Sequence, residues 1–179
     1  MEGGPIRVRE ATPDDTDAIV DVTAAGWRTA YRGIVALDRL ADLPVARWRH
    51  EVHVGLRRPV DDAFSYVAEI DGQFAGYCFV AAPSRERELG PDVAELVAIY
   101  VAPDRWGQGA GGALMRAAMD RLAQLPYDEV FLWTFEENAD AIRFYERQGW
   151  RRDGDRKVHP RSEAVAIRLR RSVGSAAGT

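Results

Sequence analysis

The sequence predicts a single α/β (α+β) domain in which helices flank a mixed, mostly antiparallel central sheet. Its 179 residues suffice for one ordinary domain with a buried core. Apolar residues make up 46% of the chain and charged residues 29%, as in soluble globular proteins. Strand and helix patterns follow one another without a repeat or a linker. We therefore expect one domain over residues 1–171 and a flexible tail over 172–179, a small and polar segment.

The first third of the chain predicts a strand followed by two helices. Apolar and charged residues alternate from Ile6 to Arg9, which is the period of a half-buried strand. Thr12 can cap a helix that has Pro13 at its first position. A second helix is expected between Pro44 and Gly55, where apolar residues again recur at helical spacing.

The middle of the chain predicts an antiparallel meander. Two strand-like runs, Phe64–Ile70 and Phe74–Val80, flank Asp71-Gly72, a dipeptide that favours a two-residue hairpin. A charged loop over 83–91 separates them from a third long strand, Glu95–Val101. This part therefore supplies the antiparallel portion of the expected sheet.

The last third predicts two further helices and three strands. A glycine-rich segment opens a helix whose apolar stripe is Leu114, Ala118, Leu122 and Leu125. A strand over Val130–Phe135 precedes a helix over Asn138–Gln148, which Gly149 ends. Trp150–Arg152 and Ala164–Leu169 are expected to close the sheet.

Composition excludes several classes of protein. The net charge of −4 argues against a general nucleic-acid binder, which would be basic. Cys78 is the only cysteine, so no internal disulfide forms and a reducing compartment is expected. No run approaches the roughly 18 apolar residues of a membrane span, and the first residues lack the pattern of a secretory signal. We expect a cytoplasmic protein with no nucleic-acid and no membrane partner.

The segment Gly107–Gly112 predicts a phosphate-binding loop. Clustered glycines between a strand and a helix expose backbone N–H groups at the positive end of the helix dipole. No Gly-Lys-Ser/Thr follows, which excludes a P-loop nucleotide triphosphatase. Gly107, Gly109 and Gly112 also satisfy G-x-G-x-x-G, so a nicotinamide-dependent oxidoreductase is an alternative. Against it, several residues including Pro103 separate the strand from the glycines, whereas the dinucleotide fold turns tightly there.

Two segments resemble the signatures of one family, the GNAT superfamily of acetyl-CoA-dependent N-acetyltransferases. Residues 95–115 read ELVAIYVAPDRWGQGAGGALM, and the signature Q/R-x-x-G-x-G/A falls on Trp106, Gly109 and Gly111. Trp106 departs from the usual Gln or Arg. Residues 138–150 read NADAIRFYERQGW and are similar to N-x-x-A-x-x-F-Y-x-x-x-G-F/W. Asn138 and Tyr145 are seven residues apart and share a helix face.

The resemblance implies an enzyme that binds acetyl-CoA as co-substrate and passes the acetyl group to a primary amine. It implies a sheet splayed at its third long strand, where main-chain groups of Ile99 and Val101 hold the cofactor arm. Tyr145 would be the general acid for the leaving thiolate, and Glu95 the base, acting through water. The alternative for Glu95 is an exposed charge at a strand end. The implied cofactor-binding residues are Ile99, Tyr100, Val101, Trp106, Gly107, Gln108, Gly109, Ala110, Gly111, Gly112, Asn138, Ala141, Phe144 and Tyr145.

The acceptor is left open as a small-molecule or peptide amine, and a homodimer is one alternative for the assembly. A catalytically weak acetyl-CoA-binding regulatory module is the alternative function. No metal is expected, because His50 and His53 lack a third ligand, and Cys78 is expected to be a core thiol. Five aromatic residues serve either as packing or as the wall of an acceptor pocket: Trp27, Tyr31, Trp48, Trp133 and Phe135.

Overall fold

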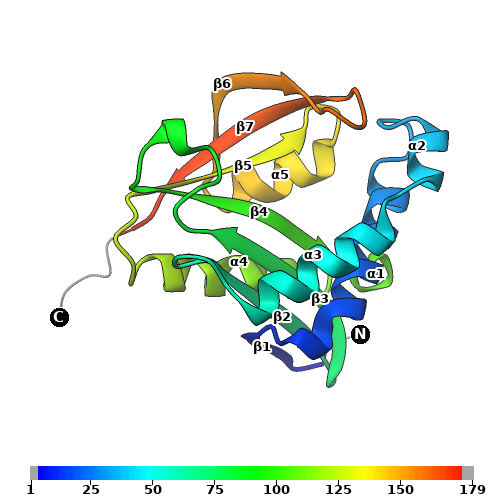
Figure 1. Cartoon of the computed structure of the whole chain (residues 1–179), viewed down its shortest axis with the longest axis horizontal. Helices are drawn as coiled ribbons and strands as arrows, with labels where there is room; N and C mark the ends of the chain where they lie inside the picture. The colour runs from blue at the N-terminus through cyan, green and yellow to red at the C-terminus, as the bar shows by residue number, and fades with distance from the viewer. Residues whose placement is uncertain (1–3, 175–179) are drawn as a thin grey trace.

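Within residues 4–174, the part of the chain that the computed structural model describes, seven strands form one sheet in the order β1-β2-β3-β4-β5-β7-β6 (Figure 1). In this part only β4 and β5 pair in parallel, and every other neighbouring pair is antiparallel. The predicted mixed, mostly antiparallel sheet is therefore confirmed. The strands are β1 Ile6–Glu10, β2 Phe64–Ile70, β3 Gln73–Ala81, β4 Val93–Val101, β5 Glu129–Phe135, β6 Arg151–Val158 and β7 Val165–Ser172. The helices are α1 Thr16–Ala30, α2 Leu37–Ala41, α3 Val45–Arg57, α4 Ala110–Leu122 and α5 Ala139–Arg147, with short 3-10 turns η1 Pro13–Asp15, η2 Arg87–Leu89 and η3 Pro103–Arg105.

Helices cover both faces of the sheet, as Figure 1 shows. The apolar stripe of α4 packs with α5 in one core cluster, which includes Leu114 and Ile142. α1 packs on the opposite face, where Ile19 and Val22 meet Tyr77 of β3. α3 lies over α1 and has no fully buried residue. The first face thus holds the main core, and the second face is more thinly covered.

The sheet opens between β4 and β5, and this opening positions the candidate site. β4 pairs with β5 only over Val93–Glu95, whereas its pairing with β3 continues to Val101. A bulge leaves Val97 without a partner in β3, because Phe79 faces Ala98 and Val80 faces Leu96. A bulge bends its strand and re-aims its backbone groups. Residues 93–96 are buried and residues 97–101 only half-buried, so the second half of β4 presents a strand edge to the opening.

Three elements differ from their sequence-based predictions. α2 was not predicted, because it is a single turn whose N-cap position holds Ala36, a residue that cannot cap. β6 extends to Val158 instead of Arg152, and all of its residues are exposed, so it has no apolar alternation to reveal it. α4 ends at Leu122, which places Leu125 outside the helix.

The end of the domain lies slightly beyond the predicted boundary. β7 runs to Ser172. Val173 is buried, and its N–H donates to the carbonyl of Asp128. Residues 175–179 of the predicted tail lie outside the described residues.

A pair of Gly→Ala substitutions tests how closely α1 approaches β4. A Cβ at Gly26 would stand 2.7 Å from Cδ1 of Tyr100, whereas a Cβ at Gly55 of α3 meets nothing within 4 Å. Gly26→Ala should lower the free energy of unfolding by about 1–3 kcal/mol through overpacking, despite the better helix propensity of alanine. Gly55→Ala should raise it by about 0.5–1 kcal/mol. Urea unfolding of both variants checks the opposite signs, and stabilisation by Gly26→Ala would contradict this packing.

Candidate functional site

The glycine segment forms the entrance to α4 and leaves a row of backbone donors free. Gly107 and Gly109 have φ values of 77° and 93°, a conformation that suits glycine. Among the described residues, the N–H groups of Gly109, Ala110, Gly111 and Gly112 donate to no backbone acceptor, and the first helical bond comes from Ala113 to Gly109. Four free donors at the positive end of a helix dipole form a site that suits phosphate oxygens.

The loop lies against the open edge of β4. A Cβ at Gly111 would come within 3.4 Å of the Phe144 ring of α5 and 3.7 Å of the Val101 side chain of β4. The start of α4, the middle of α5 and the end of β4 therefore meet at one place. The structure brings together here most of the residues predicted to bind the cofactor.

Trp106 stands where the resembled signature has Gln or Arg, and its one donor is used inside the protein. Its indole N–H donates to the carbonyl oxygen of Val101 at 2.8 Å, while the residue stays 48% exposed. Trp106 carries no charge to offer a phosphate, and its one N–H donor is not free for one in this conformation. The same hydrogen bond uses the Val101 carbonyl, one of the main-chain groups predicted to hold the cofactor arm. Nε of the neighbouring Arg105 lies 3.8 Å from Oδ2 of Asp104.

α5 presents Asn138 and Tyr145 near the same opening. The Asn138 side chain accepts a hydrogen bond from the N–H of Ala141 and caps the helix. Tyr145 is 9% exposed and packs between Phe144 and Trp150. Burial, followed by the nearby Tyr100, raises the pKa of the Tyr145 phenol above its usual value. The phenol therefore stays protonated at neutral pH, so it can donate a hydrogen bond or a proton but cannot act as a base.

A group of phenols extends from Tyr145 across the sheet. The hydroxyls of Tyr31 and Tyr100 lie 3.3 Å apart, and the Tyr77 ring stacks on Tyr100 with centroids 6.1 Å apart. Burial raises the pKa of Tyr31 to about 12 and keeps Tyr100 and Tyr77 neutral as well. Tyr77 was not singled out from the sequence, because a tyrosine in a strand carries no signal beyond packing. Tyr100 was predicted, but through its position in β4 and not through its hydroxyl.

Glu95 is buried and paired, so it is not the exposed strand-end charge that was one reading of the sequence. It lies opposite Phe131 at the last β4–β5 pair, and its side chain is 5% exposed. The Arg85 guanidinium donates to both carboxylate oxygens at 2.9 and 2.7 Å. The structure thus brings Glu95 together with Arg85, which the sequence did not reveal because loop 83–91 has no periodic pattern.

A cavity of about 670 Å³ lies on the α1 side of the sheet. Its lining combines α1, the α2–α3 segment and the turn between β6 and β7, with Trp27 and Trp48 among the walls. Tyr31 and Phe135 pack behind Trp27 with ring centroids 5.0 and 6.0 Å away. Trp133 lies elsewhere and donates to Glu86. Of the five aromatic residues considered from the sequence, two therefore line this cavity.

The remaining candidates are placed as follows. Cys78 is buried, and burial raises the pKa of its thiol to about 12, so it is not a nucleophile at neutral pH. Within residues 4–174 no group of three or more His, Cys, Asp or Glu side chains is arranged to hold a metal ion. None of the helices in this part of the chain combines the length and apolar character that a membrane crossing requires.

Comparisons with known proteins give a consistent result. The family model described as "Acetyltransferase (GNAT) family" matches residues 32–150. An uncharacterized N-acetyltransferase of Bacillus subtilis (strain 168), YuaI, is 30% identical over 169 residues, covering 92% of this chain and 89% of its own length. Mycothiol acetyltransferase of Sanguibacter keddieii is 37% identical over 95 residues, but this match spans only 30% of that protein.

Solved structures share the fold. The PaiA N-acetyltransferase of Thermoplasma acidophilum, crystallised with coenzyme A, superposes with a TM-score of 0.76 over 94% of this chain and 99% of its own, at 16% sequence identity. At this identity the likeness concerns the fold alone. The resemblance inferred from the two sequence signatures is confirmed by the family match.

Proposed function

Because the chain belongs to the GNAT acetyltransferase family, we propose that it transfers the acetyl group of acetyl-CoA directly to a primary amine. The observation that carries this proposal is the meeting of three features at the β4–β5 opening: the free N–H row of α4, the unpaired edge of β4, and α5, whose Tyr145 belongs to the same core cluster as Ile99 and Val101. We further propose that the protein acts in the cytoplasm, alone or as a homodimer, without a metal ion.

The residues at the opening fit the chemical groups of coenzyme A. Phosphate oxygens would accept hydrogen bonds from Gly109–Gly112, and the glycine at 111 leaves the room that a side chain would fill. The edge of β4 over Ile99–Val101 would pair with the amides of the pantetheine arm. Acetyl-CoA supplies the acetyl group as an activated thioester. Tyr145 would donate from its hydroxyl to the leaving sulfur.

The cofactor is tested by thermal stabilisation. Coenzyme A at about a hundredfold excess over its dissociation constant should stabilise the fold by about 2.7 kcal/mol. NAD and NADP should have much smaller effects. The dinucleotide fold turns tightly from its strand into the glycines, whereas here η3 separates β4 from the glycine segment. A thermal shift with NAD and none with coenzyme A would contradict the proposal.

Glu95 is proposed as the base, and its pairing with Arg85 calls for a matched pair of variants. An amine with a pKa near about 10.4 is mostly protonated at neutral pH and needs help to lose its proton. Glu95→Gln should therefore lower turnover at neutral pH, and the defect should shrink as the pH rises. Asp15→Asn removes a carboxylate that is likewise buried and paired with an arginine, Arg9 at 2.8 Å, so it should cost stability without this pH-dependent defect. Equal pH–rate profiles for the two variants would make Glu95 a structural residue.

A further inference from the structure

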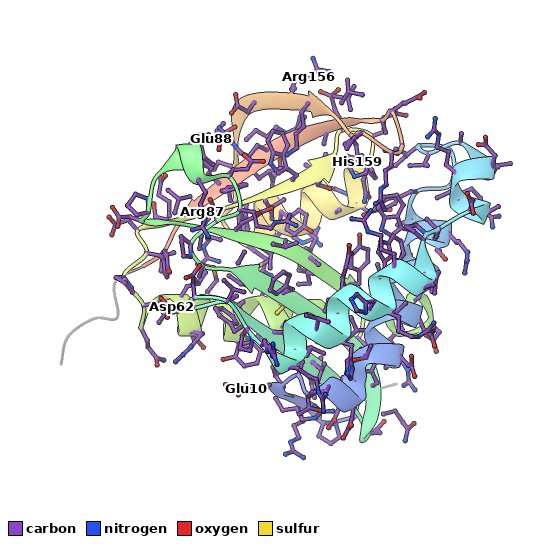
Figure 2. The ribbon with its side chains drawn as sticks, in the orientation of Figure 1. Glu10, Asp62, Arg87, Glu88, Arg156 and His159 are labelled. Atoms are coloured by element: carbon purple, nitrogen blue, oxygen red, sulfur yellow. The ribbon has the colours of Figure 1, made fainter. Side chains whose placement is uncertain are left out.

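His159 faces the cavity with its hydrogen-bonding pattern already fixed. It lies in the turn between β6 and β7, at the end of this hairpin that faces α2 (Figure 2). Two groups of Ser162 approach Nδ1 of His159: the backbone nitrogen lies 3.3 Å from it, and the hydroxyl oxygen lies 3.0 Å from it. Because a backbone N–H can only donate, we assign Nδ1 as an acceptor and place the imidazole proton on Nε2. Nothing in the described part of the chain accepts from Nε2.

The surroundings of His159 favour the neutral imidazole. Burial lowers its pKa, and Arg161 and Lys157 lower it further. With Nδ1 occupied and Nε2 protonated, His159 cannot take a proton from an amine. It offers instead one N–H donor to whatever enters the cavity.

The position of His159 connects the cavity to the opening in the sheet. Its ring contacts Trp27 and Phe135 at centroid distances of 5.8 and 5.5 Å. Both of these rings contact Tyr31, and the hydroxyl of Tyr31 lies 3.3 Å from that of Tyr100. Trp27, Phe135 and Tyr31 therefore form a continuous set of contacts from His159 to Tyr100 of β4.

The charged side chains that line the cavity balance one another, with two acids and two arginines. Asp38 and Asp42 line the wall contributed by the α2 segment. Arg39 is committed, since it donates to Glu163 and to the Arg161 carbonyl, both at 2.8 Å. Arg161 is the one lining cation without an ion pair among the described residues. A carboxylate could therefore pair with Arg161, whereas an uncharged carbonyl oxygen needs only the one donor that His159 offers.

We propose that this cavity is the acceptor site and that it recognises amines carrying a carbonyl group, such as α-aminoacyl amides, with His159 Nε2–H donating to the carbonyl oxygen. The apolar side chain of such an acceptor would lie against Trp27 and Trp48. This proposal rests on the proposed acetyl transfer and names the acceptor class of the same site.

Three acceptors with one side chain test it: phenylalaninamide, phenethylamine, which lacks the carbonyl, and phenylalanine, which carries a carboxylate. His159→Phe keeps a ring against Trp27 but removes the donor. It should lower kcat/KM for phenylalaninamide about 5- to 10-fold, the worth of one neutral hydrogen bond, mainly through KM. It should leave phenethylamine unchanged. Comparing variant with wild type on each acceptor cancels the different basicities of the amines.

Two further variants make the result specific. His159→Gln retains an N–H donor and should recover part of the loss. His50→Phe makes the same substitution at an exposed position of α3 and should change none of the three acceptors. Phenylalanine, whose carboxylate can pair with Arg161, should lose less than phenylalaninamide in His159→Phe.

An equal loss for phenylalaninamide and phenethylamine in His159→Phe would overturn the proposal while leaving acetyl transfer intact. A protein that acetylates other amines and none of these three would overturn this inference alone. If it binds coenzyme A and acetylates no amine of a broader panel, the proposed function falls with it.

Discussion

Tyr145→Phe should bind acetyl-CoA almost normally and lose turnover by about 10²–10⁴-fold, the usual contribution of a positioned acid. The substitution removes one oxygen and keeps the ring between Phe144 and Trp150. A thiolate leaves tolerably well without help, so we expect the lower end of this range. Burial raises the pKa of the phenol, so Tyr145 itself should cause no alkaline decline in rate below about pH 10. Steady-state kinetics on an accepted amine measure the loss.

A matched variant separates this effect from the loss of a buried hydroxyl. Tyr127→Phe removes a phenolic oxygen that donates to Asp62 at 3.0 Å. Asp62 lies at the opposite end of the sheet from His159 (Figure 2). This variant should lose some stability and no turnover. If Tyr145→Phe instead weakens acetyl-CoA binding and leaves turnover of the bound complex unchanged, Tyr145 is a binding residue and not the acid.

Gly109→Val should reduce coenzyme A affinity about a hundredfold or more in a protein that still folds. Gly109 is the N-cap of α4 and has φ of 93°, a conformation that a branched residue adopts only with strain. The new side chain and the shifted backbone would disturb several donors to phosphate, each worth about 1.5–3 kcal/mol when its acceptor is charged. Titration calorimetry measures the affinity.

Gly154→Val is the control for the effect of backbone strain alone. Gly154 of β6 has φ of 97°, and a Cβ there meets nothing within 4 Å. Its substitution should cost similar stability and leave coenzyme A affinity unchanged. Gly111→Val is a poorer probe, because a Cβ at this position already approaches Phe144. Unchanged affinity in a folded Gly109→Val protein would mean that the glycine segment is only a turn.

Elements defined by local chemistry were predicted closely. The hairpin of β2 and β3 follows from Asp71-Gly72, whose φ values of 53° and 73° are those a tight two-residue turn requires. The entrance to α4 follows from its glycines. The C-terminal end of α5 follows from Gly149, which has φ of 87°. In each case the residues that carry the sequence signal lie within a few positions of the element that they predict.

Features that depend on distant residues were not predictable from one sequence. β7 inserts between β5 and β6, an order that no local pattern encodes. The ion pair of Glu95 with Arg85 joins a strand to an irregular loop. The cavity combines α1 with a turn more than a hundred residues later, so Trp27 and His159 show no relation in the sequence. The proposed cofactor site is formed mostly by residues of two local sequence signatures, so it could be predicted. The proposed acceptor site is formed by residues that only long-range contacts bring together, so it could not.

The central claim is direct transfer of an acetyl group from acetyl-CoA to an amine. The most direct measurement incubates the protein with acetyl-CoA labelled in its acetyl carbon and a panel of amines, and follows free thiol together with the labelled product by mass spectrometry. We expect thiol and N-acetylated amine to appear in equal amounts, and both to fall together in Tyr145→Phe. Coenzyme A binding without any labelled product, across a panel that includes aminoacyl amides, would contradict the claim and leave a regulatory acetyl-CoA-binding module.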